Sequence, residues 1–460
     1  MANIKRIDRE KGTTYKITVT TGRGTDGKQV RHYMTWTPPS GMKSTRYDEE
    51  ARKAAYEFER KISLGIAADD RQTFAAYAEY VLELKKNTGM KRRTLELYRS
   101  MLPRVNQHIG HLKVTAIRPQ HLNRMYTALS AERSAPEKAT PKADLLPLVK
   151  ARYQSIEALG RSCGVSATTL SPAIHGRTVS RKTADALAAA LGKKPEELFT
   201  FSQDKSQLSS RTVHGYHRFV SMVFGQAEKE MLILYNPAHR ATPPKQTKKE
   251  AESFQPEELA RILDALESEP IKWRMITHLL IVTGCRRGEI LGLHWDAIDK
   301  DRKQLRIERA LLYSPEAGTY EDTTKTGETR YIKVPTETID LLKVYEAFYL
   351  GLKVKCGELW KESDYVFTRD MGGPMNPQSI TQWLEGFSKR HGLPPIHPHK
   401  FRHTLASLLI YNGTDILTVS KRLGHSQVST TTDIYSHAIR EADERAAESI
   451  ADIVLRRAAQ

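Results

Sequence analysis

Two stretches without apolar periodicity divide this 460-residue chain into segments that must each build a core of their own. Residues 135–142 are rich in Ala, Pro and Lys, and residues 237–249 combine prolines with lysines, as linkers do. At roughly 100–200 residues per domain, the length allows about three domains. We therefore expect a multidomain protein and take its segments in turn.

The charge balance favours a polyanionic partner. Lys and Arg number 72 against 54 for Asp and Glu, which gives a formal net charge of +18. Such a chain attracts phosphate backbones and releases their counterions when it binds. Double-stranded DNA is the expected partner, and a basic protein with no nucleic-acid function is the alternative.

Several classes of protein are excluded by composition. The best apolar run, from Met275 to Val282, is short and contains His278, so no membrane-spanning helix is expected. The N-terminus lacks the apolar core of a signal peptide. The three cysteines lie too far apart for a disulfide framework or a clustered zinc site. We expect a cytoplasmic, nucleoid-associated protein without a bound metal or cofactor.

Residues 1–66 predict a small β/α domain. Polar and apolar residues alternate over 14–20 and again over 30–36, as in half-buried strands. Apolar residues then recur at helical spacing over 48–64. A small twisted sheet with basic edges can lie in a DNA groove. DNA binding and protein packing are both open for this segment.

Residues 70–134 and 205–240 predict the two halves of a helical domain. Amphipathic patterns run over 73–85, 92–110, 118–129 and 209–231. The basic residues at one helix start and in the following linker are the candidate DNA contacts of this region: Arg92, Arg93, Lys245, Lys248 and Lys249.

Between these halves, residues 143–202 have a different pattern. Gly164 supplies a left-handed turn between two predicted helices, and Ser166 caps the second helix. This arrangement resembles the helix-turn-helix of Cro- and repressor-type DNA-binding domains, which makes Thr168 and Thr169 candidate DNA contacts. Pro172 lies inside the second helix and can kink it. A helical bundle that serves protein contacts is the alternative.

Residues 250–440 carry five polar motifs in a mixed α/β pattern. An apolar helix is interrupted at Gly284, and a strand over 305–312, a polar loop and a returning strand over 329–335 follow it. The loop lysine is expected at the tip of this hairpin. The motifs are Thr283-Gly284-Cys285-Arg286-Arg287-Gly288-Glu289, Thr324-Lys325-Thr326, His399-Lys400-Phe401-Arg402-His403-Thr404, Leu423-Gly424-His425-Ser426 and Tyr435-Ser436-His437. Alone, each motif has an ordinary interpretation, such as a surface ion pair or a solvated lysine.

In this order, the motifs resemble the tyrosine recombinase (phage integrase) family. The resemblance is strong over 250–440 and weaker over 1–134 and 205–240, and the layout is similar to an integrase of a phage or conjugative transposon. It implies a multidomain, mainly α protein with small β-sheets. The implied parts are an N-terminal β/α domain for arm-type sites, a helical core-binding domain with the inserted helix-turn-helix, and an α+β catalytic domain.

The resemblance implies a strand transfer that needs neither ATP nor a metal. Tyr435 is the implied nucleophile, and its oxygen forms a 3′-phosphotyrosine while a 5′-hydroxyl leaves. The phosphorus becomes pentavalent and its nonbridging oxygens gain charge. Arg286 and Arg402 suit this step because guanidinium groups are planar, permanently charged and bidentate.

The remaining motif residues have implied supporting roles. Lys325 resembles the general acid that protonates the leaving oxygen. His399 resembles the residue that assists proton transfer at Tyr435. His425 adds a donor to the nonbridging oxygens, and Glu289 orients Arg286 as a partner behind it.

The family resemblance also implies partners. We expect a homotetramer on DNA that can be a monomer when free, with a host DNA-bending protein and an excisionase as helpers. Residues 441–460 predict a tail helix that docks on a neighbouring subunit, and packing on its own domain is the alternative. A transcriptional regulator and a type IB topoisomerase-like relaxing enzyme are the rival functions.

Overall fold

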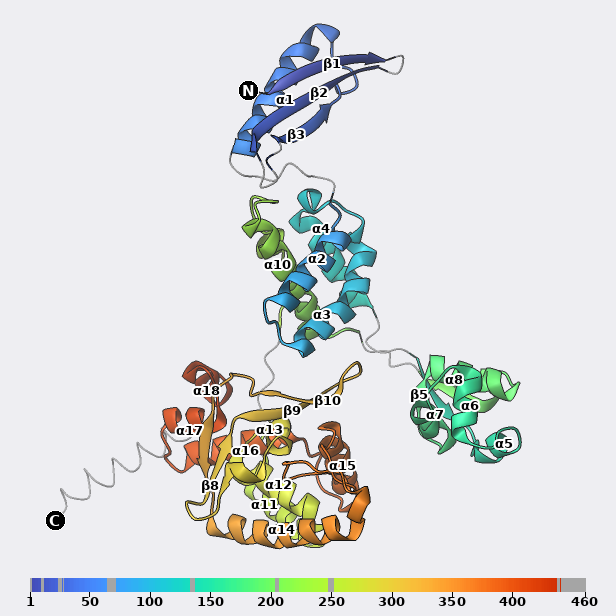
Figure 1. Ribbon diagram of the computed structural model, residues 1–460, viewed down its shortest axis with the longest axis vertical. Coiled ribbons are helices and arrows are strands. Elements are labelled where there is room, and N and C mark those ends of the chain that lie inside the picture. Colours follow the sequence, from blue (N-terminus) through green and yellow to red (C-terminus); the bar gives the residue numbers. More distant parts are fainter. Residues whose placement is uncertain are drawn as a thin grey trace, which may run out of the picture. The chain divides into compact units, whose positions relative to one another are not determined.

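The computed structural model (Figure 1) describes residues 2–9, 12–23, 27, 29–63, 72–132, 137–202, 207–246, 252–436 and 439. The chain divides into two compact units, Met1–Thr247 and Lys248–Gln460. The expected tail helix, together with Lys248, Lys249 and His437, lies outside the described residues. Among the described helices, none is long and apolar enough to cross a membrane.

The N-terminal part of the first unit is an antiparallel sheet covered by one helix. Its strands are β1 (Asn3–Arg9), β2 (Gly12–Arg23) and β3 (Gln29–Trp36), in the order β1-β2-β3, and its helix is α1 (Tyr47–Ser63). Ile17 of β2 is buried beside Ala55, Phe58 and Ile62 of α1. The two predicted strands and the helix are confirmed, and β1 is an addition.

Four helices from two separate stretches share the second core of this unit. They are α2 (Phe74–Asn87), α3 (Arg92–Val105), α4 (Pro119–Ala131) and α10 (Ser210–Lys229). A π-helical turn, Asn106–Gly110, extends α3. The stretch between α4 and α10 leaves and returns at one point, because the Leu208 amide donates to the Glu132 carbonyl over 3.0 Å.

The inserted stretch has a core of its own. Its helices are α5 (Leu146–Lys150), α6 (Ile156–Cys163), α7 (Ala167–Ile174), α8 (Arg181–Leu191) and α9 (Pro195–Leu198). Its strands are β4 (Lys138–Pro141), β5 (Val179–Ser180) and β6 (Phe199–Ser202), in the order β5-β4-β6.

The turn between α6 and α7 matches the sequence pattern. Gly164 ends α6 with φ 65°, and the Ser166 hydroxyl caps α7 by accepting from the Thr169 amide. The helix α7 continues past Pro172 to Ile174. Residues 138–141, expected in a linker, form β4 because their backbone pairs with both β5 and β6.

The second unit is mainly helical around two small sheets. Its helices are α11 (Pro256–Leu266), α12 (Ile271–Thr283), α13 (Arg287–Leu291), α14 (Thr336–Cys356), α15 (Gln378–Arg390), α16 (Pro398–Tyr411), α17 (Ile416–Leu423) and α18 (Val428–Ile434). Its strands are β7 (Ile298–Asp299), β8 (Gln304–Ile307), β9 (Arg309–Ser314), β10 (Gly318–Thr323) and β11 (Arg330–Lys333).

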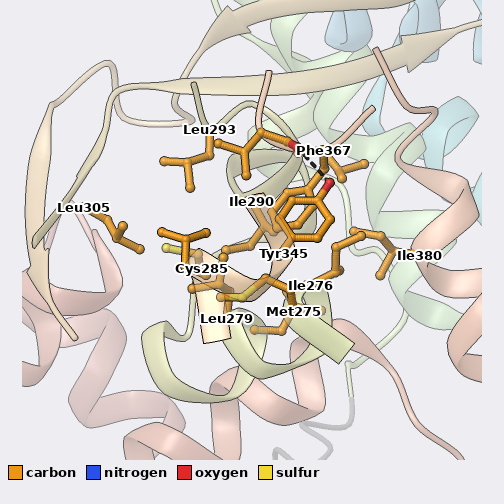
Figure 2. Packing of buried hydrophobic residues seen from close by; sticks show 14 of the residues in the cluster. Met275, Ile276, Leu279, Cys285, Ile290, Leu293, Leu305, Tyr345, Phe367 and Ile380 are labelled. Atoms are coloured by element: carbon orange, nitrogen blue, oxygen red, sulfur yellow. Dashed lines mark hydrogen bonds between the residues drawn. The ribbon is translucent and has the colours of Figure 1, made fainter. Parts of the chain in front are cut away.

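The main core of this unit lies between α12, α14 and the sheets. Figure 2 shows Met275, Ile276 and Leu279 of α12 converging on Tyr345 of α14. The buried Tyr345 hydroxyl donates to the Val366 carbonyl over 2.9 Å. The α12 helix therefore packs in the main core of the unit up to the turn that follows it.

The strand expected over 305–312 is two strands that belong to different sheets. The first half, β8, pairs with β11 and β7, whereas β9 pairs with β10. A Cβ atom on Gly288 would lie 2.6 Å from the Leu311 carbonyl, so α13 rests directly on β9. Because the β9–β10 hairpin is inserted between β8 and β11, Lys325 lies in the connection from β10 to β11. The prediction that Lys325 lies at the tip of a hairpin is wrong.

Candidate active site

The first candidate arginine follows the end of α12. Gly284 ends this helix with φ 65°, and a Cβ atom there would lie 2.9 Å from the Leu405 and Leu423 side chains. Arg286 then caps the start of α13. Its amide and its Nη1 donate to the Glu289 carboxylate over 2.9 and 2.7 Å. The predicted Arg286–Glu289 pair is therefore present.

The second candidate arginine joins two loops through its side chain. Arg402 of α16 is 4% exposed. Its Nη1 donates to the Gly284 carbonyl over 2.8 Å, and its Nη2 donates to the Leu423 carbonyl over 2.7 Å. Burial and then the nearby Arg286 lower the pKa of Arg402 to about 10, which leaves it charged at neutral pH. Arg286 Nη2 reaches the next carbonyl, that of Gly424, at 3.5 Å.

His425 stands beside these guanidiniums because Gly424 ends α17 with φ 68°. Its Nδ1 lies 2.8 Å from the Thr431 hydroxyl of α18. Burial, followed by the charges of Arg402 and Arg286, lowers the pKa of His425 to about 4. The imidazole is therefore neutral at neutral pH, and one of its nitrogens carries a proton that it can donate.

Tyr435 follows α18 and is 3% exposed. Its ring packs with Ala406, Ile410 and Leu423 in a small core of α16, α17 and α18. Burial raises the pKa of the phenol to about 12, against the opposing charge of Arg402. The charge of Arg402 therefore acts on the phenol, and the phenol oxygen forms a hydrogen bond with a side chain of α16.

That partner is His403, which sequence reasoning missed. His403 Nδ1 lies 2.9 Å from the Tyr435 hydroxyl. Burial, then His399 and Arg402, lower the pKa of His403 to about 4, so the ring is neutral and its tautomer sets which partner donates in this hydrogen bond. A signal was available, because His403 lies one helical turn after His399 and shares its face.

His399, expected to act at Tyr435, is exposed in the first turn of α16. Nearby protein atoms partly shield its imidazole from water, and this desolvation lowers its pKa. The charges of Arg402 and then Arg286 lower it further. The charges of the two arginines therefore act on the His399 ring, whereas it is His403 that forms the hydrogen bond with the phenol.

Lys325 is the candidate that the fold leaves outside the cluster. It is exposed in the β10–β11 connection, and no described residue forms an ion pair with it. The connection closes on itself, since the Gly327 amide donates to the Thr324 carbonyl over 3.1 Å and the Thr324 hydroxyl donates to the Glu328 carbonyl over 3.0 Å.

The candidate DNA contacts that the structure describes belong to the first unit. Arg92 and Arg93 are exposed at the start of α3, and Lys245 is exposed after the helical core. The Thr169 hydroxyl lies 2.7 Å from that of Ser166 at the start of α7. The Thr168 side chain lies outside what the structure describes.

The cluster has the chemistry of a tetrahedral oxyanion site. Two guanidiniums and a neutral imidazole supply donors, and a phenol lies at their edge. Within the described ranges, no group of three His, Cys, Asp or Glu side chains could hold a metal ion.

Comparison with known proteins shows which family the chain is similar to. The profile of the phage integrase family matches residues 252–441. A XerC-like tyrosine recombinase of Caldanaerobacter subterraneus is 31% identical over 265 residues, which cover 54% of this chain and 67% of that protein. The ICEBs1 integrase of Bacillus subtilis is 26% identical over 249 residues, with the same coverage of 54% and 67%.

A likeness to a solved structure supports the same fold. A fragment of the Tn1549 transposon integrase, solved in complex with circular-intermediate DNA, matches with a TM-score of 0.55 at 15% identity. The match covers 82% of this chain and 99% of the fragment. The mainly helical architecture with small sheets is therefore that of the integrase fold.

Proposed function

The chain belongs to the phage integrase family of tyrosine recombinases, enzymes that exchange DNA strands at specific sites, and we propose that Tyr435 is its nucleophile. The phenol oxygen attacks the scissile phosphorus, the bond to the 5′ oxygen breaks, and a 3′-phosphotyrosine holds the strand end. The 5′-hydroxyl of another strand reverses the step, so strands are cut and rejoined at the ends of a mobile element.

The two guanidiniums would bind the nonbridging oxygens of that phosphate. Arg286 and Arg402 keep their charge permanently, and His425 adds a third donor. Lys325 would protonate the leaving 5′ oxygen, and Glu289 would hold Arg286 in place. Tyr435 is buried, so attack requires its phenol to move outward from His403 toward the bound phosphate.

One observation carries this assignment. A single buried side chain, Arg402, bonds the carbonyls of Gly284 and Leu423. These carbonyls directly precede the Cys285–Arg286 and Gly424–His425 segments, so three motifs that are distant in sequence meet at one guanidinium. No surface ion pair would need this convergence.

The N-terminal part is proposed to bind arm-type DNA sites with the face of its sheet that α1 leaves open. Strand alternation puts Lys16 opposite the buried Tyr15 and Ile17. Lys5 pairs with Lys16 across the strands, and the Lys16 Nζ lies 5.1 Å from the centre of the Tyr33 ring. Cations and an aromatic ring on an open twisted sheet suit a DNA groove.

The two other parts of the first unit are proposed as further DNA-binding domains. The α2–α3–α4–α10 core would bind the core site, with Arg92, Arg93 and Lys245 on phosphates. In the insert, the pair α6–α7 would serve as the helix-turn-helix, with Thr169 exposed on α7, Arg177 exposed after it and Lys182 exposed on α8. We propose that the insert reads a separate stretch of duplex through α7.

We also propose a homotetramer on DNA. Synapsis of two sites, each cut on two strands, requires four nucleophiles. Residues 441–460 would dock on a neighbouring subunit, and a host DNA-bending protein and an excisionase would set direction on the nucleoid. The relative from Tn1549 was solved with circular-intermediate DNA, which makes such a junction the natural substrate to test.

The test uses a duplex selected from a random-sequence library by the full-length Tyr435→Phe protein, here called the selected duplex. The unsubstituted chain should form an SDS-resistant adduct with a nicked form of it, also in excess chelator. The Tyr435→Phe protein should bind equally well and form none, because phenylalanine lacks the attacking oxygen. Tyr411→Phe, an exposed tyrosine of the same unit, is the matched control.

The products separate the rival functions. Two circles that carry the selected duplex should give exchanged products. Relaxed circles alone would indicate a topoisomerase, and binding without any adduct would indicate a regulator. An adduct that persists in Tyr435→Phe would remove Tyr435 from its role.

A further inference from the structure

A third arginine, Arg330 of β11, lies behind the pair expected to bind the phosphate. Its Nη2 donates to Glu289 Oε2 over 2.5 Å, while Arg286 Nη1 donates to the other oxygen, Oε1, over 2.7 Å. The Glu289 side chain is 1% exposed and that of Arg330 11%. A buried carboxylate is therefore held between two guanidiniums.

Arg330 outweighs Arg286 as the neutralising partner of Glu289. Burial alone would raise the pKa of this carboxyl, but the charge and hydrogen bond of Arg330, and then the charge of Arg286, lower it to about 2. Without Arg330, one buried carboxylate would face one guanidinium, and the charge of Arg286 would be largely cancelled. With Arg330, the trio keeps a net charge of +1, which Arg286 presents outward.

The same guanidinium is tied to the end of α17. Arg330 Nε donates to the Arg422 carbonyl over 3.1 Å. Arg402 bonds the next carbonyl, that of Leu423, and Arg286 approaches the one after, that of Gly424. Three arginines thus hold three consecutive carbonyls at a helix C-terminus, where the helix dipole favours cations.

The Arg330 side chain packs closely against Gly424. A Cβ atom on Gly424 would lie 3.0 Å from Arg330 Nη1 and 3.2 Å from its Cδ. Gly424 also has φ 68°, which few side chains tolerate. The residue that follows is His425, so the position of Arg330 fixes where this imidazole begins.

We propose that Arg330 is a positioning residue of the strand-transfer reaction, which compensates the buried Glu289 so that Arg286 keeps its charge for the phosphate. This inference rests on the proposed function. It also assigns Arg330 a second task, to anchor the α17 end that carries His425.

The test separates charge from shape with three variants of the full chain. Arg330→Met keeps the length and removes the charge, and Arg330→Lys keeps the charge with fewer donors. The double variant Arg330→Met/Glu289→Gln removes both buried charges while the amide can still accept from Arg286. Arg306→Met, on the neighbouring strand and paired with surface carboxylates, is the matched control.

Two quantities are measured on the selected duplex. Adduct formation at saturating DNA should fall by about 100-fold in Arg330→Met, as for the loss of one oxyanion donor. The salt dependence of binding, measured in the Tyr435→Phe background, should weaken by about one phosphate contact, because Arg286 is then neutralised by Glu289. Arg330→Lys should keep the salt dependence and lose part of the rate.

Rescue distinguishes compensation from a merely structural role. The double variant should regain about tenfold of the lost rate and the original salt dependence. Arg330→Met that cleaves like the unsubstituted chain, or a double variant that regains neither quantity, would overturn the inference. If Arg330→Met does not fold, Arg330→Lys and the double variant still decide it. Failure of the proposed function would appear differently, as no adduct with the unsubstituted chain.

Discussion

The two loops that carry the cationic candidates differ in how the protein holds them. The turn at Gly284–Arg286 is bonded to Arg402 of α16 and to the end of α17, and the Arg286 side chain is 23% exposed. The β10–β11 connection bonds mainly to itself and leaves Lys325 exposed. The two candidate phosphate-binding arginines are therefore held by contacts within the protein itself, whereas we expect the lysine to take its position against the bound strand.

The largest effect should come from removing the buried guanidinium that is bonded to the Gly284–Arg286 turn. Arg402→Ala removes the side chain that donates to the Gly284 and Leu423 carbonyls and, with it, a proposed phosphate ligand. We expect adduct formation to fall by about 1000-fold and the free energy of unfolding to fall by about 3 kcal/mol. Adduct assays and thermal unfolding measure the two losses.

Arg390→Ala is the control for this change, since that guanidinium is half-exposed and its partner Glu269 keeps a second contact, with His391. It should leave adduct formation intact. An Arg402→Ala protein with an unchanged melting temperature would contradict the account of a clamp held by buried hydrogen bonds.

Lys325→Ala should have a smaller effect, and on the rate alone. Lys325 is exposed and forms no hydrogen bond or ion pair with a described residue, so we expect the melting temperature not to move. Adduct formation should fall by about 100-fold, because the leaving 5′ oxygen loses its proton donor. A duplex with sulfur at the bridging 5′ position should restore the rate, since a thiolate leaves without a proton.

Lys343→Ala, exposed on α14, serves as the control for Lys325. Equal impairment on the oxygen and sulfur substrates would assign Lys325 to DNA binding and not to proton donation. An altered melting temperature would mean that the connection is less independent than its contacts indicate.

The smallest effect concerns pH and the imidazole at the phenol. His403 has a folded-state pKa of about 4, below the usual value near 6.5, so the unfolded chain binds a proton that the folded chain does not. Its contribution to stability is present above about pH 6.5 and is lost as pH falls toward about 4. His403→Asn keeps an acceptor for Tyr435 but cannot titrate.

Melting temperatures between neutral pH and the acid limit measure this difference. His403→Asn should lose less stability on acidification than the unsubstituted chain. His397→Asn, an exposed position at the start of the same helix, should follow the unsubstituted chain. Identical acid profiles for His403→Asn and the unsubstituted chain would show that the buried imidazole is not the titrating group.

The sequence predicted what local chemistry determines. Gly284, Gly424 and Ser166 stand at helix ends because their conformations or caps end and start helices, and the motifs adjoin these ends. It predicted a returning strand that pairs with the first, as β11 does with β8, but not the other contacts between strands that are distant in sequence. The break between β8 and β9, the pairing of β4 and the use of Arg330 all depend on partners far along the chain.

The candidate site shows the same difference between local contacts, which the sequence predicts, and distant contacts, which it does not. Arg286 and Glu289 are three residues apart, so their pairing could be read locally. The contact of His403 with Tyr435 joins two helices and required the fold. A histidine one helical turn from a predicted site residue is a candidate for the same role. The packing of the helices determines which of the two histidines contacts the phenol.

The hydrogen bond between Glu132 and Leu208 has a consequence for how such enzymes diversify. Because the chain leaves and re-enters the helical core at one point, the inserted module adds little constraint on the host fold. We expect that a module joined by so narrow a stem can be deleted or exchanged for another while the helical core around it still folds. If the module binds DNA as proposed, such an exchange would change the site to which the protein is recruited and leave the catalytic unit unaltered.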